Sequence, residues 1–333
     1  MFSFEKKQVV HKVGGVKVGG SPGENSTFMV ASMFYSGHKK VLEREADREK
    51  GKFNKKRAEI LINDLETISD KTGIPAGLDL VANYTEEAAN YIDFVTSITD
   101  MPFTTDIWNV KPKLGAAKFI SEQNLQDRHI YNSLAPWSTD IELEISTIKE
   151  LGLKNVLLVA FNAQDPSIPG KLSILKEKLL PWAERAGFKN YIIDTSLMSI
   201  PSSAFAFIAG KRVKEEFGLP VGCAPSNGTD MVKRKTERIF EKGGFIALDS
   251  AAHAIGASFW QDFLLFGPIE SAPWLFPAVA TANAMLPAFI WEERRALPQD
   301  DNHPLNKFYR DFVDTLLGKK KIRGDMKAPK EED

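Results

Sequence analysis

One pattern recurs along most of this 333-residue chain: a short run of β-branched or aromatic residues, a turn, and then a longer amphipathic stretch. Eight short runs have the composition of strands, at residues 28–34, 77–82, 102–106, 129–132, 155–162, 191–194, 219–224 and 261–266. Helical periodicity marks segments between them, including 54–71, 86–98, 140–151, 171–186, 202–217 and 229–241. Strict alternation predicts a parallel sheet, and eight units in about 290 residues favour a closed (β/α)8 TIM barrel.

Glycines and the ends of the chain refine this prediction. Gly73, Gly152, Gly187 and Gly218 each close an amphipathic run, as expected for left-handed helix caps. No G-x-G-x-x-G motif follows the first strand, which argues against a doubly wound fold. Residues 8–12 and 16–18 flank Gly-Gly and predict a β-hairpin that closes the barrel bottom. We expect one domain over residues 1–318, with the hairpin in about the first 25 residues, and a charged, mobile tail over residues 319–333.

The composition excludes several classes of protein. Lys and Arg number 43 against 44 Asp and Glu, so the net charge of -1 gives no attraction for nucleic acid or an anionic membrane. The single cysteine, Cys223, excludes an intramolecular disulfide framework and fits a reducing compartment. The first ten residues lack the apolar core of a signal peptide. We therefore expect a cytoplasmic protein.

One apolar segment needs a separate explanation. Residues 271–291 carry no charge and reach the length of a bilayer span. Pro273, Pro277 and Pro287 interrupt backbone pairing that lipid cannot replace. We therefore predict a buried or subunit-facing helix pair rather than a membrane span, and we expect a homodimer that uses this region.

Polar residues end or follow most of the predicted strands. They are Asn83, Asp106, Asn132, Asn162, Asp194 and Asn227. Catalytic groups of such barrels come from the carboxyl ends of the strands, so these carboxylates and amides should meet at one rim. No lysine stands at those ends for Schiff-base chemistry, and the five histidines show no metal-binding spacing, so we expect no metal site. A glycosidase using Asp106 and Asp194, with Trp108 and Trp137 as sugar platforms, stays open as an alternative.

A ring of Asp and Asn suits a pterin. An ionised Asp only accepts hydrogen bonds, so it matches the adjacent 2-amino and N3–H donors of a pterin ring, and an Asn amide matches a neighbouring carbonyl or ring nitrogen. Strand-end Asp and Asn residues can also serve only as helix caps, but six around one rim make that explanation harder to hold for all of them.

Several motifs resemble the H subunit family of tetrahydromethanopterin S-methyltransferase. They are Phe-Ser-Phe-Glu at residues 2–5, Val-Gly-Gly-Val-Lys-Val-Gly-Gly-Ser-Pro-Gly-Glu at 13–24, Phe-Tyr-Ser-Gly-His-Lys at 34–39, Ala-Phe-Asn-Ala-Gln-Asp-Pro-Ser at 160–167 and Phe-Gly-Pro-Ile-Glu at 266–270. The likeness covers most of residues 1–310, and the family includes soluble bacterial methylcobamide:tetrahydrofolate methyltransferases. It implies a pterin-binding (β/α)8 barrel that moves a methyl group between N5 of a reduced pterin and the cobalt of a corrinoid protein.

The resemblance also implies roles for individual residues. Asp106, Asn132 and Asp194 fall where related methyltransferases hold the pterin ring, with Asp194 on the 2-amino and N3–H edge. Asn227 resembles the mobile amide that reaches N5 and is the expected catalytic residue. Asn162 and Asp165 are expected as further members of the pocket, although their segment can also simply cap a helix.

The expected substrates follow from the same resemblance. We expect the methyl group to arrive as methylcobalamin on a partner corrinoid protein, because this chain has no D-x-H-x-x-G corrinoid signature. The charged stretch 39–53 and the apolar stretch 271–291 depart from the archaeal pattern, and they favour tetrahydrofolate as the pterin. The alternatives are a tetrahydromethanopterin-specific H subunit of a membrane complex, or a corrinoid-docking subunit without turnover.

Overall fold

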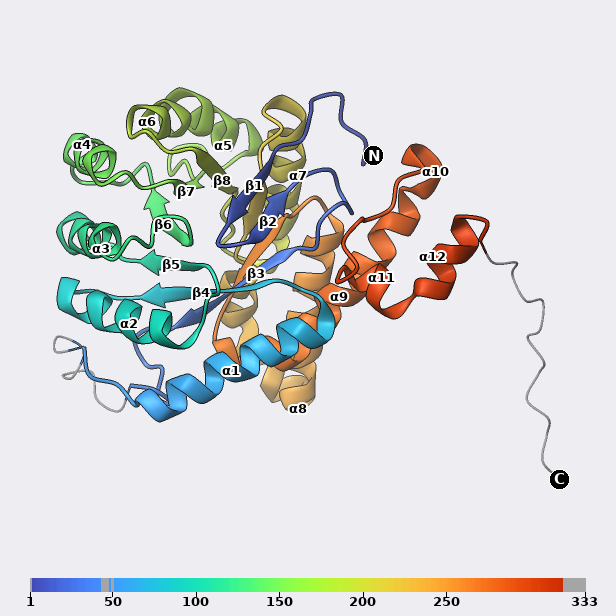
Figure 1. The fold of residues 1–333 in the computed structure, drawn as a ribbon, viewed down its shortest axis with the longest axis horizontal. Helices are drawn as coiled ribbons and strands as arrows, with labels where there is room; N and C mark the ends of the chain where they lie inside the picture. The colour runs from blue at the N-terminus through green and yellow to red at the C-terminus, as the bar shows by residue number, and fades with distance from the viewer. Residues whose placement is uncertain (1, 43–47, 49–50, 320–333) are drawn as a thin grey trace.

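Eight parallel strands form a closed barrel in this computed structural model, which describes residues 2–42, 48 and 51–319 (Figure 1). The strands pair in the order β10-β3-β4-β5-β6-β7-β8-β9. Their bounds are β3 Phe28–Met33, β4 Ala76–Val81, β5 Phe103–Asp106, β6 His129–Leu134, β7 Asn155–Val159, β8 Asn190–Asp194, β9 Val221–Cys223 and β10 Phe263–Phe266. Each strand overlaps one of the eight predicted runs, so the predicted (β/α)8 barrel is confirmed.

Helices cover the outside of the barrel. Their bounds are α1 Lys55–Thr72, α2 Thr85–Ile98, α3 Val110–Glu122, α4 Ile141–Leu151, α5 Ile168–Ile174, α6 Leu180–Arg185, α7 Ile200–Glu216 and α8 Pro225–Ser258. The helix predicted over 171–186 is present as one contiguous helical stretch, in which a π-helical turn at Leu175–Leu179 lies between α5 and α6. The four glycines predicted as helix caps all have positive φ, between 65° and 80°.

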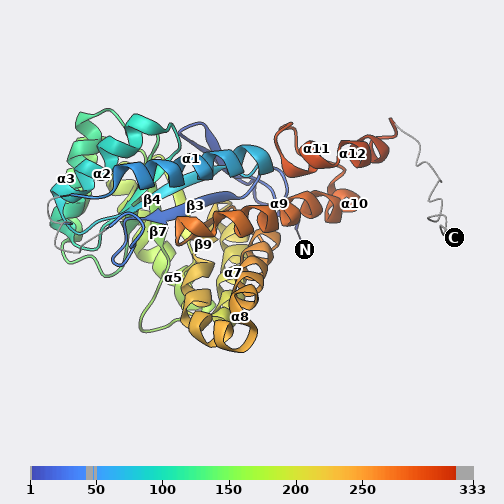
Figure 2. The ribbon, with the colours of Figure 1, turned by 90° about the horizontal axis from the view of Figure 1, so that it is seen from below.

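The helix predicted over 229–241 is the first arm of a helical hairpin. Within α8, Glu241 has φ 58° and ψ -171°, which breaks the helix. Thr229 Oγ1 then donates to Asp249 Oδ1 at 2.8 Å, and Lys233 Nζ lies 4.7 Å from the centre of the Phe245 ring. Both contacts require two antiparallel arms, which project from the barrel in Figure 2. The prediction ended at residue 241 and did not include the second arm.

The amino-terminal hairpin closes one end of the barrel. Strands β1 (Val10–Val13) and β2 (Val16–Gly19) pair antiparallel around Gly14 and Gly15, whose φ values of 51° and 90° fit a two-residue turn. Val13 and Val18 are fully buried in a cluster with side chains from inside the barrel, among them Phe28. The hairpin and its position at the amino ends of the strands are therefore as predicted.

The apolar segment 271–291 forms one helix rather than a pair. After a 3-10 turn at Ile269–Ser271, α9 spans Ala272–Phe289 with Pro277 and Pro287 inside it. Each internal proline removes one backbone hydrogen bond, and packing against α8 and α1 compensates for the loss. Three short helices follow, α10 Trp291–Arg294, α11 Pro304–Phe308 and α12 Arg310–Leu316. Among the described residues, no helix combines the length and the hydropathy that a membrane span requires. Most of the predicted tail, 320–333, lies outside the described residues.

Two glycine caps offer a matched test of packing between α1 and the carboxyl-terminal segment. Gly73 and Gly152 have φ values of 73° and 65°. A Cβ on Gly73 would collide with the carbonyl oxygen of Asn302, whereas a Cβ on Gly152 would meet nothing within 4 Å. We expect Gly152→Ala to cost about 1–2 kcal/mol of unfolding free energy and Gly73→Ala to cost about 1–3 kcal/mol more. Urea denaturation measures both, and equal losses would contradict the Asn302 contact.

Candidate active site

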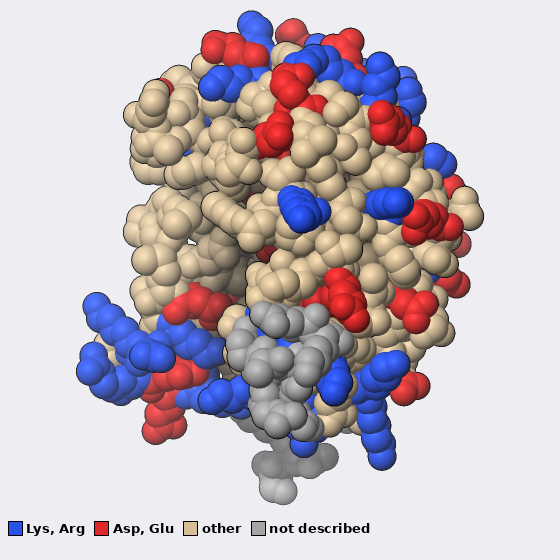
Figure 3. Space-filling view, turned by 90° about the vertical axis from the view of Figure 1, so that its left-hand side faces the viewer, with Lys and Arg blue, Asp and Glu red and all other residues tan. Residues whose placement is uncertain are grey.

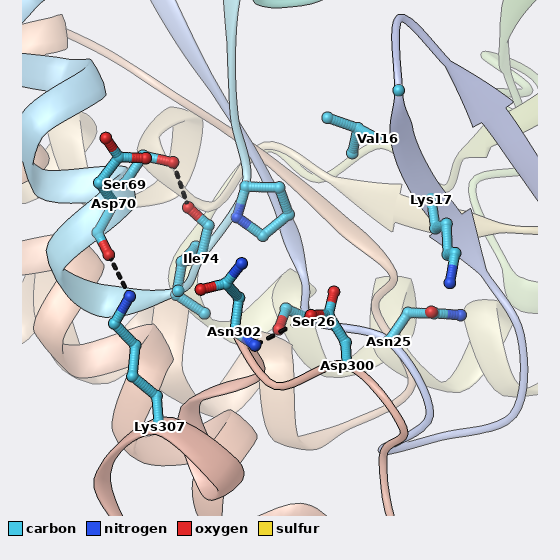
Figure 4. A pocket seen from close by; sticks show the side chains of 13 residues that line it. Val16, Lys17, Asn25, Ser26, Ser69, Asp70, Ile74, Asp300, Asn302 and Lys307 are labelled. Carbon is cyan, nitrogen blue, oxygen red and sulfur yellow. Dashed lines mark hydrogen bonds between the residues drawn. The ribbon is translucent and has the colours of Figure 1, made fainter.

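Two cavities of similar size lie at opposite ends of the barrel. One, of about 390 Å³, lies at the amino ends of the strands, between the β1–β2 turn, the end of α1 and residues 300–307 (Figure 4). Several of its polar groups form hydrogen bonds with neighbouring backbone. Lys307 Nζ donates to the carbonyl of Asp70 at 2.5 Å, and Ser69 Oγ donates to the carbonyl of Ile74 at 2.7 Å. Such contacts at the amino end of a barrel serve stability, and catalytic groups of these barrels lie at the other end.

The second cavity, of about 460 Å³, opens where the strands end. Figure 3 looks onto this face and shows a hollow in it. The polar side chains that line the cavity are Ser32, Asp79, Asp106, Lys113, Asn132, Ser133, Ser138, Asp194, Ser196 and Asn227. A neighbouring chamber of about 440 Å³ shares Ser32, Asp106 and Asn227 with it and extends toward Tyr35 and Lys233. The mouth of the barrel therefore holds one polar site with two connected parts.

Asp79 lies buried at the floor of this site, inside β4. Its carboxylate accepts hydrogen bonds from Ser32 Oγ at 2.9 Å, from Asn132 Nδ2 at 3.2 Å and from Thr104 Oγ1. Burial raises the pKa of Asp79, and the three donors oppose that shift. Because every one of these contacts places a donor on the carboxylate, the arrangement suits the ionised form.

Asp106, at the end of β5, faces the cavity above Asp79. Desolvation by the surrounding protein and the negative charge of Asp79 raise its pKa to about 7, while the Lys113 ammonium opposes the shift. Among the described residues, no side chain donates a hydrogen bond to the Asp106 carboxylate, in contrast to Asp79. The Asp106 carboxyl group can therefore take up or release a proton near neutral pH when a ligand binds.

The charge of Asp79 can be removed to test this pairing. We expect Asp79→Asn to lower the pKa of Asp106, which should still stay above the ordinary aspartate value because desolvation remains. The Asn oxygen can accept from Thr104 and Asn132, and its amide can donate to the Ser32 hydroxyl. Carboxyl NMR titration measures the change. Asp165→Asn, on an exposed loop, is the control; a pKa of Asp106 that moves equally in both variants would contradict the pairing.

Asp194 ends β8 on the opposite wall. Its Oδ1 accepts the backbone N–H of Ser196 at 2.7 Å. Burial raises its pKa to about 6, and both this hydrogen bond and the nearby Lys171 ammonium oppose the rise. Lys171 Nζ itself donates to the carbonyls of Thr195 and Ser196 at 2.8 and 3.0 Å, so it fixes the loop that carries the Ser196 donor. At pH 7 the Asp194 carboxylate is mostly ionised and has acceptor capacity left for a ligand.

Two amides complete the polar lining. Asn132, on β6, donates to Asp79 through Nδ2, which orients its amide and leaves its oxygen as an acceptor. Asn227 is exposed at the first turn of α8 and lines both chambers. Its neighbour must be glycine, because a Cβ on Gly228 would lie 2.9 Å from the backbone of Ser199. In the part of the chain described, no hydrogen bond engages the side-chain amide of Asn227, so this group is available to a ligand.

The structure separates the six residues expected at the site. Asp106, Asn132, Asp194 and Asn227 line one cavity, whereas Asn162 and Asp165 do not. Asn162 Oδ1 accepts the backbone N–H groups of Gln164 and Asp165, and Asp165 Oδ1 accepts that of Ser167. These two side chains therefore shape the turn before α5, where Ser167 caps the helix.

Several residues of the site were not expected from the sequence. Asp79 lies within a strand rather than at its end, although the acid in Gly-Leu-Asp-Leu-Val was a usable signal because β4 is otherwise apolar. Lys113 arrives from α3. Its Nζ lies 2.5 Å from Glu144 Oε1 and donates to the carbonyl of Ser133 at 3.0 Å. Within the described residues, no cluster of three or more His, Cys, Asp or Glu side chains is arranged to hold a metal.

Solved structures with a similar fold include dihydropteroate synthases. The enzyme from Xanthomonas albilineans in complex with 7,8-dihydropteroate aligns with a TM-score of 0.53 and 14% identity, over 87% of this chain and 99% of that one. The enzyme from Stenotrophomonas maltophilia aligns with a TM-score of 0.52 and 15% identity, over 86% and 97%. The fold is thus a (β/α)8 barrel like that of dihydropteroate synthases.

Sequence comparison identifies the family within that class. A family model described as tetrahydromethanopterin S-methyltransferase MtrH subunit matches residues 6–294. The H subunit from Methanopyrus kandleri is 34% identical over 90% of this chain and 97% of its own length. That from Methanococcus maripaludis is 35% identical over 92% and 99%. The chain therefore belongs to the H subunit family of tetrahydromethanopterin S-methyltransferase, as its motifs predicted.

Proposed function

We propose that this chain transfers a methyl group between N5 of a reduced pterin and the cobalt of a corrinoid held by a partner protein. The observation that carries the proposal is the convergence of Asp106, Asn132, Asp194 and Asn227 on one cavity, in a member of a methyltransferase family. The volume, about 460 Å³, lies within the range of small-molecule sites.

The polar groups of the cavity match the edges of a pterin. The ionised Asp194 accepts from the 2-amino and N3–H groups, and Asn132 and Asp106 meet the remaining polar edge of the ring. A glycosidase is less well supported. The two acids that it would use, Asp106 and Asp194, do have different surroundings. Trp108 and Trp137, however, stack on each other and do not lie apart as separate sugar platforms.

The relatives favour tetrahydromethanopterin over the tetrahydrofolate expected from the sequence. Of the two features that pointed to tetrahydrofolate, α9 packs outside the barrel and does not line the cavity, and most of residues 43–50 lie outside the described part of the chain. The curated relatives are named for tetrahydromethanopterin. We therefore propose tetrahydromethanopterin as the first substrate to test and tetrahydrofolate as its competitor.

The proposed step needs alignment more than strong acid–base catalysis. The N5 lone pair attacks the methyl carbon of the substrate, the Co–C electron pair stays on cobalt as Co(I), and the N5 proton passes to solvent water. A neutral amide such as Asn227 can accept from N5–H or donate to N5, so it can follow both protonation states. Holding the pterin in line with the methyl group can contribute about 7–11 kcal/mol. The partner must deliver the corrinoid at the open mouth, since Asn227 lies at this end of the barrel.

The test is an anaerobic transfer assay. The purified chain is mixed with methylcob(III)alamin and either tetrahydromethanopterin or tetrahydrofolate, while the cobalt spectrum reports cob(I)alamin and chromatography reports the N5-methylpterin. We expect turnover with tetrahydromethanopterin that exceeds turnover with tetrahydrofolate. Faster transfer to tetrahydrofolate would overturn the choice of pterin. Pterin binding without transfer, even with a methylated corrinoid protein, would favour a docking subunit instead.

A further inference from the structure

Three aromatic side chains stand together on one wall of the mouth. Trp108 follows β5, Trp137 follows β6 and Phe161 follows β7, so consecutive strands supply them. The rings of Trp108 and Trp137 stack with centroids 5.4 Å apart and planes 12° apart. The Phe161 ring meets Trp137 edge-on at 6.2 Å. All three line the same cavity as Asp106, Asn132 and Asp194.

The hydrophobic core does not explain this cluster. Trp108 is 71% exposed and Trp137 is 38% exposed, although large apolar side chains are usually buried when they serve folding. Mutual stacking holds both indole planes in place without a bound partner. Met198, on the loop after β8, is 62% exposed and lines the cavity as well. The upper part of the cavity is therefore preformed and apolar, above a polar floor at Asp79 and Asp106.

A ligand that fills such a cavity needs a polar ring system joined to an apolar ring. A pterin ring alone would contact the polar floor of the cavity and leave the stacked indole rings exposed to water. We propose that Trp108, Trp137 and Phe161 bind the arylamine ring that reduced pterin cofactors carry on the side chain at C6. This inference rests on the proposed function and extends it, because it assigns the tail of the substrate to a second subsite.

The geometry favours the substrate tail over the partner's corrin ring. The aromatic residues line the cavity that contains the carboxylates, rather than a separate outer surface. An aryl ring that follows the pterin out of the cavity can join the existing stack as a further member, and such stacking tolerates the differences between one arylamine tail and another. The subsite thus binds an element common to several reduced pterins.

The test compares a complete substrate with a tailless one. Anaerobic calorimetry measures the affinity of the wild type, Trp108→Ala and Trp137→Ala for tetrahydromethanopterin or tetrahydrofolate, whichever binds more tightly, and for 6-methyltetrahydropterin. We expect each variant to bind the complete pterin about tenfold more weakly, with unchanged affinity for the tailless one. Trp108→Phe should recover most of the loss. Trp291→Ala, in α10, is the control and should change neither affinity.

Each other outcome overturns the subsite in a distinguishable way. Equal losses for both ligands would mean that the tryptophans only shape the cavity. Unchanged pterin affinity with a raised KM for the methylated corrinoid protein would mean that they contact the partner. If the wild type binds neither ligand, the proposed function fails together with the subsite.

Discussion

The Asp194→Asn variant is expected to bind the reduced pterin roughly a hundredfold more weakly than the wild type. The ionised Asp194 offers two charge-assisted acceptors to the 2-amino and N3–H donors, each worth about 1.5–3 kcal/mol net. Asparagine keeps one neutral acceptor and turns an amide N–H group toward the other donor. The Asn oxygen can still accept the Ser196 N–H, so the local loop should keep its shape. Anaerobic calorimetry at pH 7.5 measures the change.

Two controls separate a lost contact from a damaged fold. Asp165→Asn also removes a loop carboxylate, but outside the cavity, and should leave the affinity unchanged. The thermal midpoint of Asp194→Asn should not fall at pH 7.5, because burial penalises the wild-type charge. Wild-type affinity should also weaken as pH falls through about 6, where Asp194 takes up a proton, and the variant should lack this step. An unchanged affinity would remove Asp194 from the pterin edge.

The barrel could be predicted because its signals are local and repeated. Each strand is a short apolar run, and glycines such as Gly73 and Gly152 mark helix ends by a conformation that other residues adopt at a cost. The α8 hairpin and the single helix α9 were not predicted correctly. The conformation of both segments depends on tertiary packing. The two arms of α8 meet through Asp249, and α9 packs on α8 despite its prolines.

The residues predicted for the candidate site lie at or near the carboxyl ends of strands, and four of the six line the cavity. Asp106 and Asp194 end their strands and reach the cavity, but Asn162 lies beyond the end of β7 and turns back onto its own loop. Asp79 was missed because a sequence does not show which face of a strand points into the barrel. The shifted pKa of Asp106 depends on that missed neighbour, so the electrostatics of the site required the structure.

The Asn227→Ala variant is expected to lower kcat by about a hundredfold while the pterin affinity changes far less. N5 becomes more positive as its lone pair attacks the methyl carbon, so a hydrogen bond from N5–H to the side-chain oxygen of Asn227 strengthens between the bound state and the transition state. Truncation removes that differential contact. Single-turnover transfer and calorimetry measure the rate and the affinity separately, which a KM value alone does not do.

Asn162→Ala supplies the comparison for this prediction. Both residues are loop or first-turn amides near the mouth, but Asn162 is engaged by backbone N–H groups and does not line the cavity. Its loss should therefore affect stability more than turnover. The Asn227 side chain is exposed and makes no contact that folding needs in the described structure, so its variant should unfold like the wild type. If Asn227→Ala weakens pterin binding and leaves the single-turnover rate unchanged, Asn227 is a binding residue and does not assist the reaction at N5, and Asp106 is the next group to test.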